Sequence, residues 1–490
     1  MMRRIAFIAS VLSVVSVRMV SAVPAVGTNL NDVRSAVKDD SVVAVSVDPS
    51  VEIGPIKPMN ATNNGPVRKG DGSRRSSWRE FAALKVPFVR THDAAFFSGY
   101  GGEHMGDVSA IFPDFDADAD DPASYDFVLT DAYVRNFAAV GTKAFFRLGQ
   151  KIEHASRKYH VYPPKDFGKW ARVAEHIIRH YTDGWAGGFD AGIEYWEIWN
   201  EPDLDADGKW KTNPRTWGGS QESFYEFYAT VATHLKKRFP QLKIGGPGFA
   251  SSPDTADDWG GKFLRAMKGG NVPIDFFSWH RYVTDPEAAV HCARTWRRIL
   301  DTCGYPEAES ILDEWNYVEG WDDVFFQRSV DAIRGVRGAA LVAATMAGCQ
   351  KSSVDMLMYY DLRPGCSFNG VFDSDTLAPL PGYWSFYAWR KLRDAGTEIA
   401  AEVSGAAKGI FAVAAKGREG KGVLLVASYQ ADPNVCRSRK VSVSVKGRPF
   451  SSGAVKLVDS RFQYGETEFR VNDGTLELYL EPCAFAVIEF

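Results

Sequence analysis

The sequence predicts an α/β protein: a (β/α)8 barrel of the TIM type with an accessory antiparallel β-sandwich domain. Between residues 52 and 395, short apolar runs alternate eight times with amphipathic stretches, which is typical of a parallel barrel. After about residue 400 the chain changes to short strands of branched residues joined by Gly, Pro, Asn and Asp turns. With 490 residues the chain is also too long for one compact core, so two domains are expected.

Eight strands and eight helices are predicted for the barrel. The strands are Ile56–Thr62, Pro87–His92, Lys143–Leu148, Ile193–Asn200, Lys243–Pro247, Phe276–His280, Ser310–Glu314 and Asp355–Tyr360. The helices are Ser73–Leu84, Phe127–Val140, Asp166–Tyr181, Ser220–Phe239, Gly260–Met267, Pro286–Cys303, Val324–Ala347 and Gly382–Ala395. A doubly wound sheet would also suit this alternation, but it should carry a Gly-rich phosphate turn after its first strand. The segment there, Asn63-Asn64-Gly65-Pro66, has the composition of an ordinary turn.

The predicted sandwich uses both ends of the mature chain. Its later strands are Gly409–Ala414, Gly422–Tyr429, Lys440–Val445, Ala454–Asp459 and Leu476–Phe490. Ser41–Val47 is a further strand that precedes the barrel and is expected to complete the sandwich. The expected boundaries are therefore 52–395 for the barrel, and 41–51 together with 396–490 for the sandwich.

The first 22 residues have the pattern of an export signal. Arg3 and Arg4 form a basic start, Ile5–Val17 is apolar, and Val20-Ser21-Ala22 resembles a cleavage site. We expect a secreted or periplasmic protein that does not span a membrane once the signal is removed. Export permits disulfides among the six cysteines, and the sequence leaves their pairing open.

Composition narrows the class of partner. The net charge of −4 argues against nucleic acid or an anionic membrane. The 14 Trp and 19 Tyr suit the stacking of sugar rings, although large barrels are rich in aromatic residues for structural reasons too. Because no Cys, His or Asp cluster has the spacing of metal ligands, we expect no metal and no other cofactor.

Two glutamates lie where predicted strands end. Glu201 follows the fourth strand in Trp199-Asn200-Glu201-Pro202, and Glu314 ends the seventh. Pro202 has no amide hydrogen, so regular strand pairing stops there. Catalytic residues of barrel enzymes lie at these carboxyl ends. Hydrolysis of a glycoside needs a proton for the departing oxygen and a negative group beneath the anomeric carbon, and two carboxylic acids can supply both.

This chemistry predicts distinct roles for the two glutamates. Glu201 would act first as the acid and then as the base, whereas Glu314 would be the nucleophile, about 5–5.5 Å away in a retaining enzyme. Asn200 is expected to hydrogen-bond the 2-hydroxyl of the sugar. Arg90, near the end of the second strand, is expected to keep Glu314 ionised.

The chain resembles the clan A retaining glycoside hydrolases, and within them family 39, the β-xylosidase and α-L-iduronidase family. The supporting residues are Trp196–Asp203, Gly245-Gly246-Pro247, Ser278–Tyr282 and Arg90-Thr91-His92, and the resemblance spans nearly the whole mature chain. It implies that His92, His280 and Tyr282 line the sugar subsite, and that Tyr282 orients the nucleophile. Two positions depart from the family pattern. Trp315 stands where Phe or Tyr is expected after the nucleophile, and the eighth strand ends in Tyr359-Tyr360 where the clan commonly has Trp.

The expected substrate is an oligosaccharide or polysaccharide. An iduronidase must hold a carboxylate, which calls for Lys or Arg in the pocket. Tyr282 occupies the position where the resemblance would place that Lys, so a neutral β-xyloside is favoured. Arg363 and Lys151 keep the iduronidase alternative open, although both are interpreted as solvent-exposed loop residues. A barrel that binds carbohydrate without turnover is the other alternative, and the presence of both glutamates argues against it.

Overall fold

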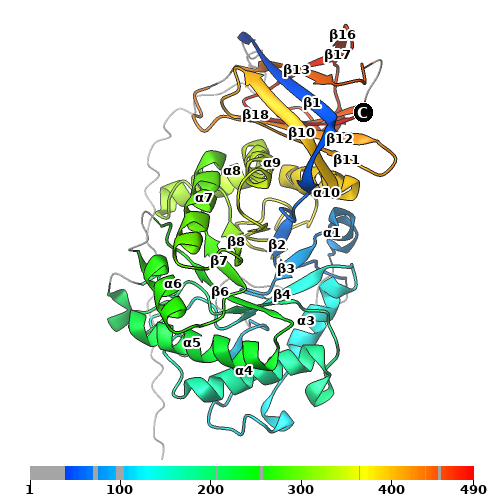
Figure 1. Cartoon of the computed structure of the whole chain (residues 1–490). Helices are drawn as coiled ribbons and strands as arrows, with labels where there is room; N and C mark the ends of the chain where they lie inside the picture. Colours follow the sequence, from blue (N-terminus) through cyan, green and yellow to red (C-terminus); the bar gives the residue numbers. More distant parts are fainter. Residues whose placement is uncertain are drawn as a thin grey trace, which may run out of the picture.

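A computed structural model describes residues 39–69, 75–94, 104–205, 208–253, 258–363, 365–435, 437–450 and 454–490. The predicted export signal at 1–22 lies outside these residues. The described chain forms a closed barrel of eight parallel strands and a separate ten-stranded sheet (Figure 1), which confirms the predicted fold class. Within this part of the chain, no helix has the length and apolar character needed to cross a membrane.

All eight predicted barrel strands are present. They are β2 (Ala61–Asn63), β3 (Phe88–Arg90), β4 (Lys143–Leu148), β5 (Tyr195–Ile198), β6 (Lys243–Phe249), β7 (Phe276–His280), β8 (Glu309–Trp315) and β9 (Met356–Tyr359). The first differs most from its prediction, because it begins at Ala61 and not at Ile56. The residues before it connect the barrel to β1 (Asp39–Pro55), which belongs to the other sheet.

The helices cover the outside of the barrel. The α-helices are α1 (Trp78–Leu84), α2 (Val108–Ile111), α3 (Val128–Ala138), α4 (Phe167–Thr182), α5 (Gln221–Arg238), α6 (Trp259–Gly269), α7 (Pro286–Thr302), α8 (Asp323–Arg334), α9 (Val336–Gln350) and α10 (Pro381–Ala395). Short 3-10 turns are η1 (Pro122–Ser124), η2 (Trp185–Gly187) and η3 (Lys209–Lys211). The single helix predicted over Val324–Ala347 is wrong: Gly335 is extended, with φ −103° and ψ −175°, and separates α8 from α9.

The second sheet contains β1 and all the strands after the barrel. These are β10 (Thr397–Gly405), β11 (Ile410–Lys416), β12 (Gly422–Tyr429), β13 (Arg439–Val445), β14 (Ala454–Val458), β15 (Gln463–Glu466), β16 (Arg470–Asn472), β17 (Thr475–Leu480) and β18 (Cys483–Glu489). The sheet is not wholly antiparallel, since β1 runs parallel to β13. The single strand predicted over Leu476–Phe490 is two strands, separated at Glu481-Pro482 because Pro482 cannot donate to a ladder.

The two sheets meet through helices. In Figure 1 the ten-stranded sheet lies beside α9 and α10, and the long β1 runs from it to the first barrel strand. Alternate residues of β11, β12 and β18, such as Phe411, Leu425 and Phe485, join the same apolar core as the alanine-rich helix α9. The hydroxyl of Tyr429 also donates to the carbonyl of Thr284 over 2.8 Å. A shared core therefore fixes the sheet against the barrel.

Gly348 on α9 is a sensitive point of this contact. A Cβ at this position would lie 2.9 Å from Val290 Cγ2 and 3.4 Å from Phe411 Cδ1. Gly348→Leu should therefore overpack the junction and lower the free energy of unfolding by about 1–3 kcal/mol, measured as a lower Tm. Gly269→Ala is the matched control, since a Cβ there meets nothing within 4 Å. Equal Tm values for the two variants would contradict this description of the junction.

Candidate active site

The barrel interior changes from apolar to charged along the strands. Phe145, Tyr195, Phe276 and Ile311 form an apolar layer inside the barrel. Two residues further along β5 and β8, on the same inward face, come Glu197 and Asp313, both fully buried. The layer of charge therefore lies toward the carboxyl ends of the strands, where barrel enzymes carry their chemistry.

An irregularity in β8 brings two consecutive acidic residues to the interior. Trp279 pairs with Leu312, but the next pair is His280 with Glu314, so β8 has one extra residue at Asp313. The same shift appears against β9, between the pairs at Leu312 and Trp315. A bulge of this kind re-aims side chains. As a result both Asp313 and Glu314 reach the same interior arginine.

Glu201 is held in an unusual backbone conformation. Trp199 and Glu201 have φ values of 74° and 47°, in the left-handed region that non-glycine residues seldom adopt. The surrounding chain fixes this conformation: the amide of Glu201 donates to the carbonyl of Gly248 over 3.0 Å, and Thr216 Oγ1 donates to the carbonyl of Glu201 over 2.6 Å. Backbone strain of this type is concentrated at functional sites.

Arg90 lies at the centre of the charged layer, with no exposed surface. Its Nε lies 2.7 Å from Glu197 Oε2 and 2.9 Å from Asp313 Oδ2. Its Nη1 lies 3.3 Å from Glu314 Oε2, and its Nη2 donates to Asn200 Oδ1 over 2.7 Å. One guanidinium thus faces three carboxyl groups and the amide beside Glu201.

Two carboxyl groups beside Arg90 have pKa values that shift in opposite directions. Burial raises the pKa of Asp313 well above its usual value, and the neighbouring Glu197 adds to the rise. Burial also acts on Glu197, but there Arg90 and hydrogen bonds from Asp313 and Ser278 outweigh it and lower the pKa.

Burial raises the pKa of Glu201 to about 8, and the negative charge of Asp203 adds to the rise. His280 Nδ1 and Glu201 Oε1 share a hydrogen bond of 2.8 Å, whereas His280 Nδ1 is 3.7 Å from Glu314. The resemblance implied that His280 lines the sugar subsite, and in the structure its direct hydrogen-bond partner is Glu201. Burial lowers the pKa of His280 to about 4, which leaves the ring neutral near pH 7.

Tyr282 donates from its hydroxyl to Glu314 Oε1 over 2.6 Å. Burial raises the pKa of Glu314 to about 7, and negative Glu201 adds to the rise, against the opposing effects of His280, Arg90 and the Tyr282 hydrogen bond. Arg90 therefore lowers this pKa, in the expected direction, but the net shift of the Glu314 pKa is upward. Arg90 is shared among three carboxyl groups, and the cost of burying the charge exceeds its effect. The pKa of Glu314 still lies below that of Glu201.

The two glutamates face each other across the mouth of the barrel. One oxygen of Glu201, one oxygen of Glu314 and one ring nitrogen of His280 all lie within 4.8 Å of one another. This is also the group among the described residues whose atoms could hold a metal ion. Two carboxyl groups at this distance, with different pKa values, can instead share acid and nucleophile roles without a metal.

Asn200 and His92 complete the polar surface near the glutamates. Asn200 Nδ2 is buried and makes no hydrogen bond to any described residue, so it presents a donor to a ligand. His92 Nε2 lies 4.0 Å from Glu314 Oε2 and 3.7 Å from Asp93 Oδ1, and neither ring nitrogen makes a hydrogen bond within the described chain. All seven residues proposed from the sequence are therefore brought to one site: Arg90, His92, Asn200, Glu201, His280, Tyr282 and Glu314.

Arg363 is not the solvent-exposed loop residue that the sequence suggested, since it is only 1% exposed. Its guanidinium lies 3.4 Å from Asp361 Oδ2 and 3.7 Å from Asp93 Oδ2, and it donates to the hydroxyl of Tyr360 over 3.2 Å. Two carboxyl groups thus already face this one cation. Lys151 is half-buried, and its backbone amide donates to Asp107.

Sequence reasoning missed several members of the site. Glu197 and Asp313 face Arg90, and Asp203 raises the pKa of Glu201. The signal for Glu197 was present, because a glutamate inside an apolar strand must face a buried partner. Asp313 gave no such signal, since strict alternation would direct it to the face opposite Glu314.

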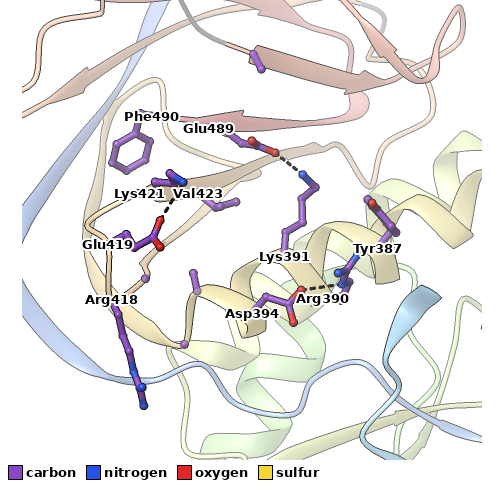
Figure 2. Close-up of a pocket in the computed structure, with 15 residues that line it drawn as sticks. Tyr387, Arg390, Lys391, Asp394, Arg418, Glu419, Lys421, Val423, Glu489 and Phe490 are labelled. Carbon is purple, nitrogen blue, oxygen red and sulfur yellow. Dashed lines mark hydrogen bonds and ion pairs between the residues drawn. The ribbon is translucent and has the colours of Figure 1, made fainter. Parts of the chain in front are cut away.

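A separate hollow of about 1120 Å³ lies between α10 and the β11–β12 hairpin (Figure 2). Apart from Arg418, its charged side chains pair with each other: Arg390 with Asp394, Lys391 with Glu489, and Lys421 with Glu419. None of the barrel-site residues lines it. The barrel mouth is therefore the better candidate for chemistry.

A closed barrel with two opposed glutamates at the carboxyl ends of its strands has the architecture of a glycoside hydrolase. Comparison with known proteins agrees with this class. Residues 55–297 match the model of glycosyl hydrolases family 39. A β-xylosidase of Geobacillus stearothermophilus is 23% identical over 300 residues, which cover 55% of this chain and 53% of that protein. The chain thus spans about half the length of this curated relative.

Solved structures share the fold over nearly the whole chain. A glucosidase from Croceicoccus marinus has a TM-score of 0.72 and 21% identity, covering 92% of this chain and 99% of that one. A monomeric β-xylosidase from Caulobacter crescentus has a TM-score of 0.64 and 16% identity, covering 91% and 99%. The chain belongs to glycosyl hydrolases family 39.

The pKa of Glu201 can be tested through its charged neighbours. Asp203→Asn removes a negative charge that raises this pKa, so the alkaline limb of kcat/KM should move to lower pH by about one unit. Arg215→Gln is the matched opposite, because Arg215 lowers the same pKa and its loss should move the limb upward. If both variants shift the limb in the same direction, Glu201 is not the acid that the alkaline limb reports.

Proposed function

We propose that the protein is an exported retaining glycoside hydrolase that acts on β-xylosides of oligosaccharides or polysaccharides, with Glu201 as acid and base and Glu314 as nucleophile. The observation that carries this proposal is the approach of the two glutamate oxygens within 4.8 Å. Inverting enzymes need room for a water between the carboxyl groups, which are then about 6.5–9.5 Å apart. The short approach favours direct attack by Glu314.

In the first step, the ionised carboxylate of Glu314 attacks the anomeric carbon while Glu201 gives its proton to the departing oxygen. The bond from the anomeric carbon to that oxygen breaks, and a glycosyl ester forms on Glu314. Tyr282 donates a hydrogen bond to Oε1 of Glu314, and Arg90 Nη1 lies 3.3 Å from Oε2, so the two contacts together orient the carboxylate for attack. Asn200 Nδ2 is placed to donate to the 2-hydroxyl as positive charge develops on the sugar.

In the second step, water replaces the leaving group. Esterification removes the negative charge of Glu314, so repulsion between the two carboxylates no longer raises the pKa of Glu201, which stays ionised and acts as the base. Glu201 takes a proton from the water, whose oxygen attacks the anomeric carbon and releases Glu314. Two inversions at one carbon give net retention.

A neutral sugar fits the charges of the site better than a uronate. Arg90 faces three carboxyl groups, and Arg363 faces two. A substrate carboxylate would have to displace one of these buried contacts, and an unpaired buried charge costs several kcal/mol. The sequence pattern of residues 1–22 supports export of the enzyme, to the periplasm or outside the cell.

The roles of the two glutamates predict different responses to substitution. Glu314→Ala should lose turnover, and azide should restore it with formation of the α-azide from a β-substrate. Glu201→Ala should keep slow activity on substrates with acidic leaving groups, because these need no protonation. The measurement is the rate on nitrophenyl glycosides of increasing leaving-group acidity. A similar dependence in both variants would contradict the assignment.

The choice of sugar is tested with a panel of nitrophenyl glycosides. We expect release of nitrophenol from the β-xyloside and none from the α-L-iduronide. Arg363→Met should lower the Tm, because it leaves two buried carboxyl groups without their cation. Preference for the iduronide, abolished by Arg363→Met at unchanged Tm, would contradict the proposal. Sugar binding with no release of any nitrophenol would instead support a binding protein.

A further inference from the structure

Trp321 stands out from the other tryptophans of the chain. It lies in the loop between β8 and α8 and is 64% exposed. Seven tryptophans of the described chain are among its largest fully buried side chains: Trp196, Trp199, Trp217, Trp279, Trp296, Trp315 and Trp389. Burial would stabilise the folded chain by about 25 cal/mol for each Å² of apolar surface, and an exposed indole lacks this stabilisation. The exposure of Trp321 is therefore more consistent with a ligand contact than with a purely structural role.

Three aromatic side chains near the active site pack against the exposed indole of Trp321. Its ring lies 5.1 Å from that of Tyr282, at an interplanar angle of 84°. It also lies 6.1 Å from the ring of Phe368 and 6.4 Å from that of Phe326. The contact with Tyr282 is edge-to-face, and such a contact orients a ring without covering its faces. Trp321 is therefore positioned and still leaves much of its surface open.

A single residue, Tyr282, connects Trp321 to the proposed nucleophile Glu314. Tyr282 contacts the indole on one side and donates a hydrogen bond to Glu314 on the other. Phe368 packs against both Tyr282 and Tyr360, which continues the aromatic surface along the barrel mouth. The catalytic groups themselves are buried, with Glu201 6% and Glu314 4% exposed. The sugar that is cleaved off must therefore lie deep, and the remainder of the substrate must emerge toward solvent.

We infer that Trp321 is the platform on which the leaving-group sugar of the substrate stacks. This inference rests on the proposed function, and it adds the residue that would contact the sugar ring on the leaving side. A sugar ring presents a flat face of C–H groups, which suits an exposed indole. The acidic residues Asp322 and Asp323, which follow Trp321 in the chain, would repel an anionic leaving group. The platform therefore selects a neutral saccharide.

The test compares two substrates that differ only on the leaving side. Xylosyl fluoride has no leaving-group ring, whereas xylobiose has one. Trp321→Ala should lower kcat/KM for xylobiose about tenfold, the scale of one aromatic contact, and leave xylosyl fluoride unchanged. Phe325→Ala is the matched control, since Phe325 is also exposed, at 44%, in the first turn of α8.

The outcomes separate the platform from a supporting role. Equal losses on both substrates would show that Trp321 acts only by supporting Tyr282, and an unchanged rate on xylobiose would show that it does not contact the leaving sugar. Either result overturns the inference and leaves the proposed function intact.

A binding measurement keeps the inference testable if neither substrate is cleaved. Xylobiose should change the indole fluorescence of the native protein and of Phe325→Ala, but not of Trp321→Phe. In that case the proposed function would have failed while the platform stands. A fluorescence change that persists in Trp321→Phe would contradict the platform.

Discussion

The active site depends on one buried arginine. Arg90 extends from β3 and contacts side chains of three other barrel strands: Asn63 of β2, Glu197 of β5 and the Asp313–Glu314 pair of β8. Removing one partner of a buried ion pair costs about 3–5 kcal/mol, so the arrangement is fixed as a unit. Because Arg90 also holds Asn200, both catalytic strands are positioned by the same group.

The same arrangement supports the different roles proposed for the two glutamates. Arg90 and Tyr282 both contact Glu314, and they oppose the rise in its pKa that burial causes. Glu201 lies next to neutral His280 and near Asp203, which leaves its pKa higher. Different positions therefore support the proposed roles of an acid and a nucleophile. A metal ion is not required for this division of roles between two carboxyl groups.

The sequence predicted the barrel well because its signal is repeated eight times, and the ends of β4 and β7 were placed at the right residues. The sequence-based prediction failed where a single residue changes the local secondary structure. Gly335 interrupts a helical pattern, and the extra residue at Asp313 turns two acidic side chains to one face, against the alternation of a regular strand. The burial of Arg363 could not be foreseen either, because it depends on Asp93, which lies 270 residues earlier in the chain.

The central claim is that Glu314 forms a covalent bond to the sugar. A 2-deoxy-2-fluoro-β-xyloside with a dinitrophenolate leaving group should trap this ester, because the fluorine slows both steps and the leaving group speeds only the first. Mass spectrometry of a digest is expected to find one fluoroxylosyl group on the peptide that contains Glu314. Label on the peptide that contains Glu201, or complete hydrolysis with inverted configuration and no label, would contradict this account.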